Sequence, residues 1–412
     1  MITKEQFENL IGTKLIEEED GRLYSQGSLN LEGRKDITEL PDNFTVIGAL
    51  DLSRSGVKRL SRGLDVKWWL DISGTDIEEL PEDTKFSGNF YAECMNKPFS
   101  FPKVVKTDCS FHCRGTKIKR MPEELYAKIS CDFSGSTFDN YPKVLKFGGS
   151  LYFYDTPITE LPEGLKEIYG NLDIRRTKVS KLNDNLVLYK NFDLSHTQIK
   201  DLSKGLIVNL TLDLWKVDLN DYSNLHKVCS QFAVHKDKYN EIKDSLVEHS
   251  YENLWGKVFV QYKPNYKGAY LFENDNGKYI KVDNIFGKIV EQKDNVYQVQ
   301  INSCGDIKYL VTDGVCKWSH DDILEEAKAE LLYKINKKNI DEYNNLTLES
   351  ELTFEEAIKC YRDITDANKH INDIFIKNKK DKYTIKEIIK FIEDVDEFGY
   401  KKFKEFFKKI NK

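Results

Sequence analysis

The chain has 412 residues, of which 40% are hydrophobic and 32% are charged, and its formal net charge is −6 at pH 7. This length and composition predict a soluble globular protein of two or three domains. No apolar run approaches bilayer length and the first residues do not resemble a secretory signal, which excludes a membrane protein and favours the cytoplasm. Eight scattered cysteines exclude a disulfide scaffold and fit a reducing compartment.

The first 27 residues predict a helix that caps the start of the first domain. Thr3 and Gln6 have the spacing of a capping box, and Phe7, Leu10 and Ile11 share one apolar face. We therefore expect residues 1–27 to form a capping helix and a lead-in.

Residues 28–222 contain an internal repeat. An apolar residue, often followed by proline, recurs every 20 or 21 positions, at Leu40, Leu60, Leu80, Phe101, Met121, Tyr141, Leu161, Leu182, Leu202 and Tyr222. Before most of these anchors lies an alternating apolar pair such as Leu50 and Leu52, which is typical of a strand. One such unit cannot bury its own apolar side, so the pattern predicts a solenoid of about ten stacked repeats.

Two stretches carry a family resemblance, "ITELPDNFTVIGALDL" and "ITELPEGLKEIYGNLDI". They resemble the short bacterial class of leucine-rich repeats. This chain departs from the family where many members place a buried asparagine, and we expect the hydroxyls here to bond the turning backbone instead: Ser55, Thr75, Thr116, Ser136, Thr156, Thr177 and Thr197. The least regular repeat is "FYAECMNKPFSFP", where Phe90 and Ala92 are shifted by one place and predict a bulge.

Three segments follow the repeats. In residues 223–253, "VCSQFAV" predicts a strand and "KDKYNEIKDSLVEH" a helix, which together cap the solenoid. Residues 254–319 have short β-rich runs separated by turn signals and predict a small antiparallel domain. Residues 320–412 predict a helical domain, in which Thr353 with Glu356 and Thr384 with Glu387 mark helix starts. The expected fold class is α+β.

The blocks "YLVTDGVCKWSHDDILEEAKAELLYKI", "LTFEEAIKCYRDIT" and "YTIKEIIKFIE" carry a second resemblance. They are similar to the C-terminal part of uncharacterised repeat proteins found in phages and mobile elements of gut and oral bacteria. This resemblance implies a phage or mobile-element origin and no particular activity.

Conventional catalytic and cofactor motifs do not appear in the sequence. "CSFHC" with Cys131 has the residue types of a metal cluster, but inward strand positions for Cys113 and Cys131 favour core packing, so no metal or cofactor is expected. "CGD" at Cys304 invites comparison with bacterial effector ubiquitin ligases, yet it lies in a β-rich turn before a helical segment too small for that domain. His320 precedes a helix, and capping is favoured over an active-site role.

The tail "YKKFKEFFKKINK" places aromatic residues and lysines at helical spacing, and residues 377–412 hold twelve lysines against seven acidic residues. A helix docked by its aromatic face is favoured over contact with RNA or an anionic surface. Direct nucleic-acid binding is not expected elsewhere, because no domain is strongly basic.

The outward strand positions of the repeats are the main candidate site. Alternation predicts one exposed row at Asp51, Asp71, Ala92, His112, Asp132, Tyr152, Asp173, Asp193 and Asp213. Two residues further, the same concave face carries the residue types of binding hot spots: Arg114, Tyr154, Arg175 and Trp215. Aspartate is a poor strand residue and stacked carboxylates repel, so either a partner uses the row or duplication copied "LDL" and water solvates it.

These patterns predict a non-enzymatic protein that recognises a protein partner through the concave face. With the phage-type resemblance, the expected partner is a nucleic-acid-binding host defence complex such as a CRISPR nuclease, which the protein would inhibit. The alternative is an effector enzyme, nuclease or ubiquitin-ligase-like, with its site in residues 254–412.

Overall fold

The computed structural model describes residues 2–246, 248–335, 338–367, 371–377, 379–393 and 395–410. The chain forms two compact units. The solenoid unit comprises Met1–Lys263 and Glu273–Asn276, and the C-terminal unit comprises Pro264–Phe272 and Gly277–Lys412.

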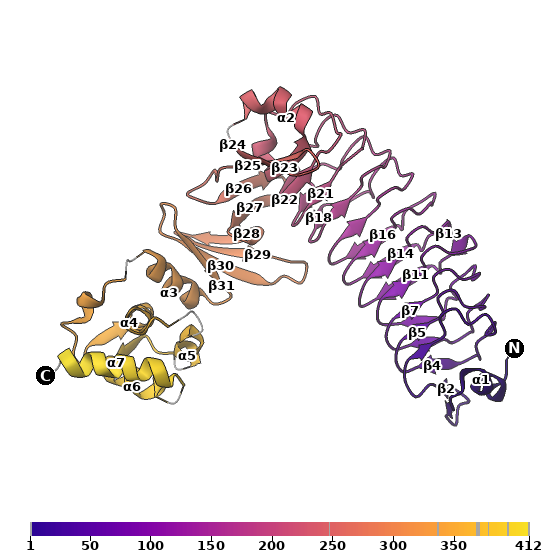
Figure 1. The fold of residues 1–412 in the computed structure, drawn as a ribbon, viewed down its shortest axis with the longest axis horizontal. Helices are drawn as coiled ribbons and strands as arrows, with labels where there is room; N and C mark the ends of the chain where they lie inside the picture. Colours follow the sequence, from indigo (N-terminus) through magenta and orange to yellow (C-terminus); the bar gives the residue numbers. More distant parts are fainter. Residues whose placement is uncertain are drawn as a thin grey trace. The chain divides into compact units, whose positions relative to one another are not determined.

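The solenoid unit is a coil whose successive turns place equivalent strands side by side (Figure 1). Its longest sheet, the main sheet, is parallel through eleven strands. These are β3 (Leu29–Asn30), β5 (Leu50–Asp51), β7 (Leu70–Asp71), β9 (Phe90–Tyr91), β12 (Phe111–His112), β15 (Cys131–Asp132), β17 (Leu151–Tyr152), β19 (Leu172–Asp173), β21 (Phe192–Asp193), β22 (Ile207–Asp213) and β23 (Cys229–His235). The 20- and 21-residue periods of the sequence are therefore the turns of a solenoid.

Most turns add a second short strand before the main-sheet strand. These strands pair in three groups: β2 (Leu23–Tyr24), β4 (Phe44–Val46), β6 (Asp65–Val66) and β8 (Lys85–Phe86); β11 (Val104–Thr107), β14 (Glu124–Ala127) and β16 (Val144–Phe147); β18 (Glu167–Ile168) and β20 (Val187–Leu188). A further parallel pair joins β10 (Phe99–Ser100) to β13 (Ile118–Arg120). Each turn is thus held to the next at more than one edge.

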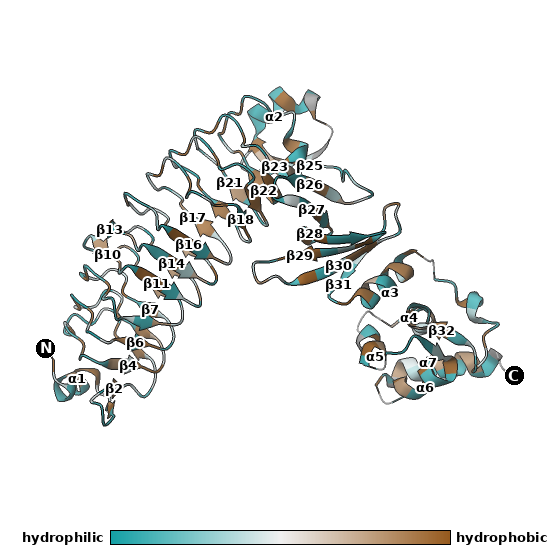
Figure 2. Ribbon diagram, turned by 180° about the vertical axis from the view of Figure 1, so that it is seen from behind, coloured by the Kyte–Doolittle hydropathy of each residue, from teal (hydrophilic) through white to brown (hydrophobic). Residues whose placement is uncertain are grey.

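Alternation along each strand builds the core of the solenoid. Leu50 and Leu52 are fully buried on either side of Asp51, and Figure 2 shows hydrophobic segments recurring from turn to turn along the coil. Four buried rings follow one another through the middle turns, with centroid separations of 5.5, 5.8 and 5.6 Å along the series Phe90, Phe111, Phe133 and Phe153. Because no turn buries its own apolar residues, the stability of each depends on its neighbours.

The corners after the main-sheet strands are closed by hydroxyl groups, as predicted. The side chains of Thr75, Thr156, Thr177 and Thr197 each donate to the carbonyl three residues earlier, at 2.6–2.7 Å. Thr116 donates to the carbonyl of Ala92 in the preceding turn, also at 2.6 Å. At Thr156, Thr177 and Thr197 the same carbonyl also accepts the threonine's backbone N–H, so the hydroxyl adds a second hydrogen bond that closes the corner.

The irregular repeat differs from the expectation for Ala92. Phe90 and Ala92 are both fully buried, and the outward residue is Tyr91, which lies opposite Asp71 and His112. The expected outward position of Ala92 is therefore wrong, because moving this strand by one residue would turn its apolar side chains to solvent. The expected irregularity is present in the same repeat, between Phe99 and Ser100, where the β10–β13 register shifts.

The start of the solenoid is capped as predicted. Helix α1 (Lys4–Ile11) has the Thr3–Gln6 capping box, and its Phe7 ring is fully buried with an edge contact to Phe44 at 5.7 Å. Strand β1 (Ile16–Glu17) then pairs antiparallel with β2. The helix thus covers the apolar end that an open coil would expose.

The other end is closed by an antiparallel return. After η1 (Leu225–Lys227) and β23 come α2 (Lys236–Ile242), η2 (Lys243–Ser245), β24 (Glu248–Glu252) and β25 (Lys257–Tyr262). The predicted strand and helix are both present, and β25 then pairs antiparallel with β23 and with β24. The solenoid sheet therefore extends past residue 253, the boundary expected from the sequence, because β25 completes the ladder of its last parallel strand.

The C-terminal unit holds most of a six-stranded antiparallel sheet in chain order; Glu273–Asn276, at its first hairpin, belong to the solenoid unit. Its strands are β26 (Tyr270–Asn274), β27 (Gly277–Val282), β28 (Ile285–Lys293), β29 (Val296–Gln300), β30 (Ile307–Thr312) and β31 (Trp318–Asp321). Helix α3 (Leu324–Ile335) packs against it through a small cluster of Val311, Ala327 and Leu331. The predicted small β domain is thus an antiparallel sheet.

The remaining helices surround α4 (Phe354–Thr365), most of whose side chains are buried. The other elements are η3 (Ile340–Tyr343), β32 (Glu351–Thr353), α5 (Ile371–Lys377), β33 (Lys382–Thr384), α6 (Ile385–Ile392) and α7 (Glu397–Ile410). The predicted capping boxes at Thr353 and Thr384 are present. The basic tail forms α7, which docks through the fully buried Phe403 and nearly buried Phe407, as predicted; its last residues, Asn411 and Lys412, lie outside the described part.

Candidate binding surface on the main sheet

The exposed side of the main sheet carries two parallel rows of side chains. The first row holds the outward residue of each strand, aligned by register: Asn30, Asp51, Asp71, Tyr91, His112, Asp132, Tyr152, Asp173, Asp193 and Asp213. The second row lies two residues further along each turn and includes Glu93, Arg114, Tyr154, Arg175 and Trp215. All twelve site residues predicted from the sequence lie in these rows.

The aspartates of the first row have a backbone role that explains their recurrence. The carboxylates of Asp51, Asp71, Asp132, Asp173, Asp193 and Asp213 each accept the backbone N–H of the residue two places on, at 2.8–3.1 Å. That N–H points out of the sheet as the strand ends, so the carboxylate supplies its acceptor. Aspartate thus stabilises the ends of these six strands, which offsets its poor strand propensity.

Opposed carboxylates nevertheless leave an electrostatic conflict in the row. Asp173 lies opposite Asp193, which in turn lies opposite Asp213. Burial and the Asp193 charge raise the pKa of Asp173 to about 6, against the opposing effect of Arg175. Arg175 forms ion pairs with Asp173 at 3.0 Å and with Asp193 at 3.7 Å. The positive charge of Arg175 therefore offsets part of the repulsion between the carboxylates of Asp173 and Asp193.

At the other end of the row, Asp51 and Asp71 oppose each other directly. Burial raises the pKa of Asp71, and the nearby charges of Asp51 and Glu32 add to this effect. Neither aspartate has an ion pair within the described residues. This end of the face is therefore its acidic part.

The middle of the face is aromatic. Tyr91 stacks on His112 with ring centroids 4.8 Å apart and an angle of 12° between the planes, and Trp69 contacts Tyr91 by an edge at 6.4 Å. Burial lowers the pKa of His112, which therefore stays neutral at pH 7. Arg114 lies 3.6 Å from the carboxylate of Asp132. The sequence analysis did not identify Tyr91 or Trp69 as site residues. Tyr91 could have been found, because it lies one 20-residue repeat after Asp71.

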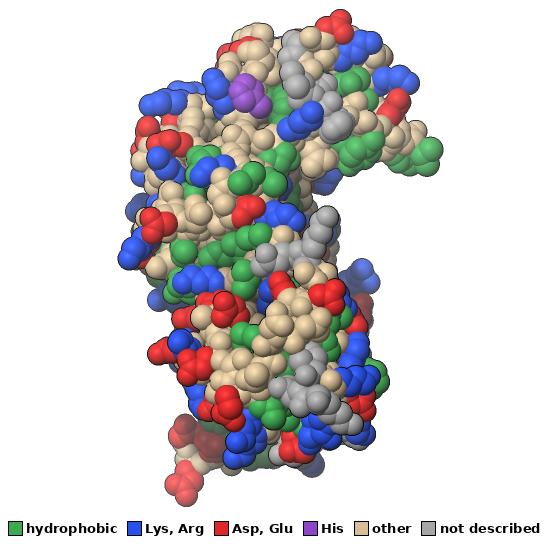
Figure 3. Space-filling model, turned by 90° about the vertical axis from the view of Figure 1, so that its left-hand side faces the viewer, with side chains coloured by type: hydrophobic (Ala, Val, Ile, Leu, Met, Phe, Trp, Pro, Cys, Tyr) green, Lys and Arg blue, Asp and Glu red, His purple; other side chains and the backbone are tan. Residues whose placement is uncertain are grey.

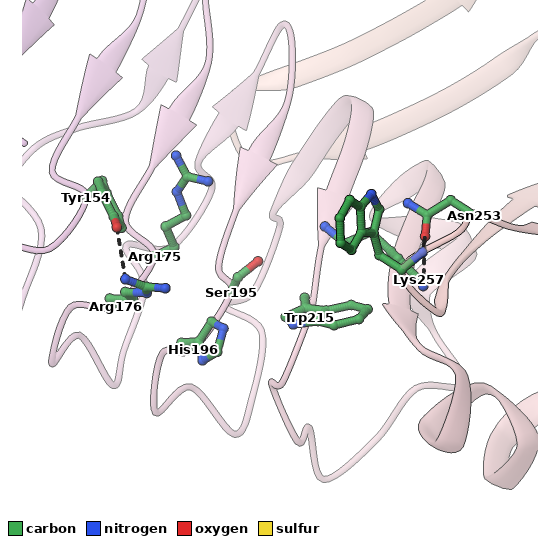
Figure 4. Close-up of a pocket in the computed structure, with 9 residues that line it drawn as sticks. Tyr154, Arg175, Arg176, Ser195, His196, Trp215, Asn253 and Lys257 are labelled. Carbon is green, nitrogen blue, oxygen red and sulfur yellow. Dashed lines mark hydrogen bonds between the residues drawn. The ribbon is translucent and has the colours of Figure 1, made fainter.

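A cleft of about 300 Å³ opens near the C-terminal end of the face (Figure 4). It is lined by Tyr154, Arg175, Arg176, Ser195, His196, Trp215, Asn253, Trp255 and Lys257. Four successive turns and the β24–β25 hairpin supply these residues. The cleft therefore combines aromatic rings with three cationic side chains.

The Tyr154 side of the cleft is built from stacked guanidinium groups. The Cζ atoms of Arg175 and Arg176 lie 4.6 and 5.6 Å from the Tyr154 ring centre, and Arg176 Nη1 donates to the Tyr154 hydroxyl at 3.0 Å. Arginine stacked on an aromatic ring is held in place while its remaining N–H groups stay available.

The opposite side is built by the hairpin. Lys257 Nζ lies 5.4 Å from the Trp215 ring centre and pairs with Asp213. The side-chain oxygen of Asn253 accepts the backbone N–H groups of Trp255 and Lys257, each at 3.0 Å. This tight turn presents the Trp255 side chain to solvent, with 83% of the residue's surface exposed.

The structure thus brings three predicted residues, Tyr154, Arg175 and Trp215, into one cleft. His112, Arg114, Tyr152 and the remaining aspartates lie elsewhere in the rows and do not line it. Of the residues that the sequence reasoning missed, Arg176 and His196 follow the second row in left-handed turns with φ of 57° and 60°. The alternating strand pattern predicts only which strand residues face outward, so it does not identify residues in the turns that follow.

The other sequence candidates lie apart from this face or inside the core. Cys113 and Cys131 are fully buried, and burial raises the pKa of both thiols. Among the described residues, no three His, Cys, Asp or Glu side chains converge to hold a metal ion. Cys304 lies in the β29–β30 turn, where Asn302 accepts its backbone N–H and that of Asp306. His320 lies within β31 rather than at a helix cap, because the strand continues to Asp321.

Charge is mixed over the part of the surface drawn in Figure 3, where basic and acidic side chains are interspersed. No helix within the described ranges is long and apolar enough to cross a bilayer. Comparison with known proteins gave no match to a protein-family model, a curated protein or a solved structure. Function is therefore inferred from the geometry of the main-sheet face.

Proposed function

We propose that this protein is a non-enzymatic recognition protein that binds a protein partner through the exposed face of its main sheet. The observation that carries the proposal is the alignment of aromatic and arginine side chains on one sheet: Trp69, Tyr91, Arg114, Tyr152, Tyr154, Arg175 and Trp215. These residue types dominate the binding energy of protein interfaces.

The scaffold supports this role because it orders the side chains before binding. Tyr91 is stacked on His112, and Tyr154 is covered by Arg175 and Arg176. Side chains that are already held lose less conformational entropy on association, so more of the contact energy is retained. The aspartates of the face are bound to backbone N–H groups, which favours positioning over proton transfer.

We propose further that the repeats are of the short bacterial leucine-rich class and that the partner is a nucleic-acid-binding host defence protein in the cytoplasm. The repeat period and the proline-marked anchors support the first part. For the second part, the acidic end at Asp51 and Asp71 has the charge needed to meet the basic groove of such a partner. A phage-encoded inhibitor of a CRISPR nuclease is one protein of this kind.

Affinity capture from the native host, with binding then measured on the purified partner, tests the proposal. Tyr152→Ala with Tyr154→Ala is expected to weaken binding at least about tenfold without unfolding the protein. The matched control is Tyr126→Ala with Tyr169→Ala, two half-buried tyrosines that lie off the main sheet, Tyr126 in β14 and Tyr169 directly after β18.

Equal loss of binding in both double variants would argue against a specific face. Binding that survives the first pair but disappears when the chain is ended at Ile335 would instead place the contact on the helices of the C-terminal unit. That truncation keeps α3 against its sheet and removes the core around α4, apart from Ala329, which α3 contributes to it.

A further inference from the structure

We infer that the cleft binds an acidic segment of the partner, with a carboxylate held by Arg176 and an apolar side chain against Trp215 and Trp255. This inference rests on the proposed function, because it names the chemistry that the same face recognises.

The first observation is the charge of the lining. Arg175, Arg176 and Lys257 reach the cleft, and none of the residues that line it is acidic. Arg175 and Lys257 have their own aspartate partners beneath them. Arg176 is exposed, and the hydrogen bond shown for it within the described residues goes to the uncharged hydroxyl of Tyr154. A guanidinium has five N–H donors in a planar fork, so Arg176 retains donors for a carboxylate.

His196 adds a polar group without adding charge. Burial lowers its pKa, and the nearby charges of Lys216 and Arg176 lower it further. The imidazole is therefore neutral at pH 7, and its ring N–H can donate to an anion.

The second observation is exposed aromatic surface beside these cations. Trp255 is 83% exposed, and its neighbours on the hairpin, Leu254 and Tyr251, are 101% and 58% exposed. Trp215 lies within the cleft, where its ring makes an edge contact with the His235 ring and the two ring centroids are 4.8 Å apart. Contiguous exposed apolar groups of this kind mark interaction sites. A ligand that combines an anion with an apolar group matches both halves of the lining.

The surroundings favour a compact anion over a polyanion. Outside the cleft, the first row presents Asp173, Asp193 and Asp213 in succession. A nucleic-acid strand that crossed the face would bring its phosphates against these carboxylates, which opposes binding. A short acidic segment avoids this conflict, and about 300 Å³ is enough for a few side chains.

The test uses the chain's own five tryptophans as reporters, in the full chain labelled with ¹⁵N at the indole nitrogens. The probe is acetyl-Asp-Phe-amide, and the neutral isostere acetyl-Asn-Phe-amide is its control. The acidic dipeptide is expected to shift the indole signals of Trp215 and Trp255 with an affinity about tenfold higher than the neutral one. The signals of Trp68, Trp69 and Trp318 should not move.

Arg176→Gln is expected to remove most of this preference. Arg54→Gln is its matched control, because Arg54 is also exposed, occupies the same place in another turn and has a φ of 55° against 57° for Arg176. Unchanged signals of Trp69 and Trp318 in each variant show that the fold is intact.

Three results would overturn the inference: equal shifts with both dipeptides, no shift with either, or tighter binding of adenosine monophosphate than of the acidic dipeptide. The last would assign the cleft to a nucleotide. These outcomes are independent of the proposed function, because partner capture that depends on Tyr152 and Tyr154 would stand even if the dipeptide failed. If the dipeptide binds but the face captures no partner, the inference about the cleft stands and the proposed function fails.

Discussion

Asp173→Asn is expected to stabilise the protein at pH 7 and to do so much less at pH 4. Asp173 is largely buried, opposes Asp193 and has a pKa of about 6, against an ordinary value of 3.8. A raised pKa means that the folded state binds this proton more tightly than the unfolded state does. The stability that protonation contributes is therefore present below pH 3.8 and is lost as the pH rises through 6.

The size of the effect follows from the shift. Each pH unit between the two pKa values changes the free energy of unfolding by about 1.4 kcal/mol, so ionised Asp173 lowers stability at pH 7 by up to ~3 kcal/mol. Asparagine resembles the protonated acid and can still accept the backbone N–H of Arg175. The variant should therefore avoid most of this loss.

Urea unfolding followed by circular dichroism at pH 4 and pH 7 measures the difference, and ¹³C NMR of the carboxyl group measures the pKa directly. Asp132→Asn is the control, because Asp132 makes the same backbone contact but lies opposite His112 and Tyr152 rather than another aspartate. Destabilisation of Asp173→Asn by the same amount at both pH values, or a measured pKa below 4, would refute the reasoning.

Three further predictions concern the solenoid and its face. Leu161→Asp places a charge at an anchor that is only 4% exposed and should lower stability by several kcal/mol; a melting temperature within a degree or two of wild type would mean that the register is wrong. A chain ended at Lys263 keeps β25 paired with β23, whereas a chain ended at Asn253 exposes the edge of β23, so the longer fragment should be more soluble and more stable. Equal behaviour of the two fragments in sedimentation and melting would count against β25 as the cap. Asp193→Asn should mainly change the salt dependence of partner association, measured as the association rate at two ionic strengths, and a salt-independent loss of affinity would contradict this.

Local patterns were enough to predict the solenoid. The anchor spacing, the alternation around Leu50 and Leu52, and the capping boxes at Thr3, Thr353 and Thr384 each depend on residues close together in the chain. Stacking then repeats one local geometry, so the order of the main-sheet strands follows from the order of the repeats. The outward rows were predictable for the same reason, except at Tyr91, where the step changes from 20 to 21 residues.

The aspartate row shows where a pattern leaves two interpretations open. Its periodicity is visible in the sequence, but a partner-binding role and a structural role predict the same spacing. Only the tertiary structure shows that each carboxylate accepts the backbone N–H two residues ahead. That contact depends on how the chain leaves the strand, which the strand period does not specify.

The cleft was decided by tertiary structure alone. The sequence placed Tyr154, Arg175 and Trp215 on one face, but it offered no reason to associate them with Trp255 or Lys257. Those two residues arrive because the chain reverses after α2 and β25 pairs antiparallel with β23, outside the repeat. A long-range pairing of this kind depends on which sheet edge is left open and how the hairpin can cover it, and no local periodicity records either condition.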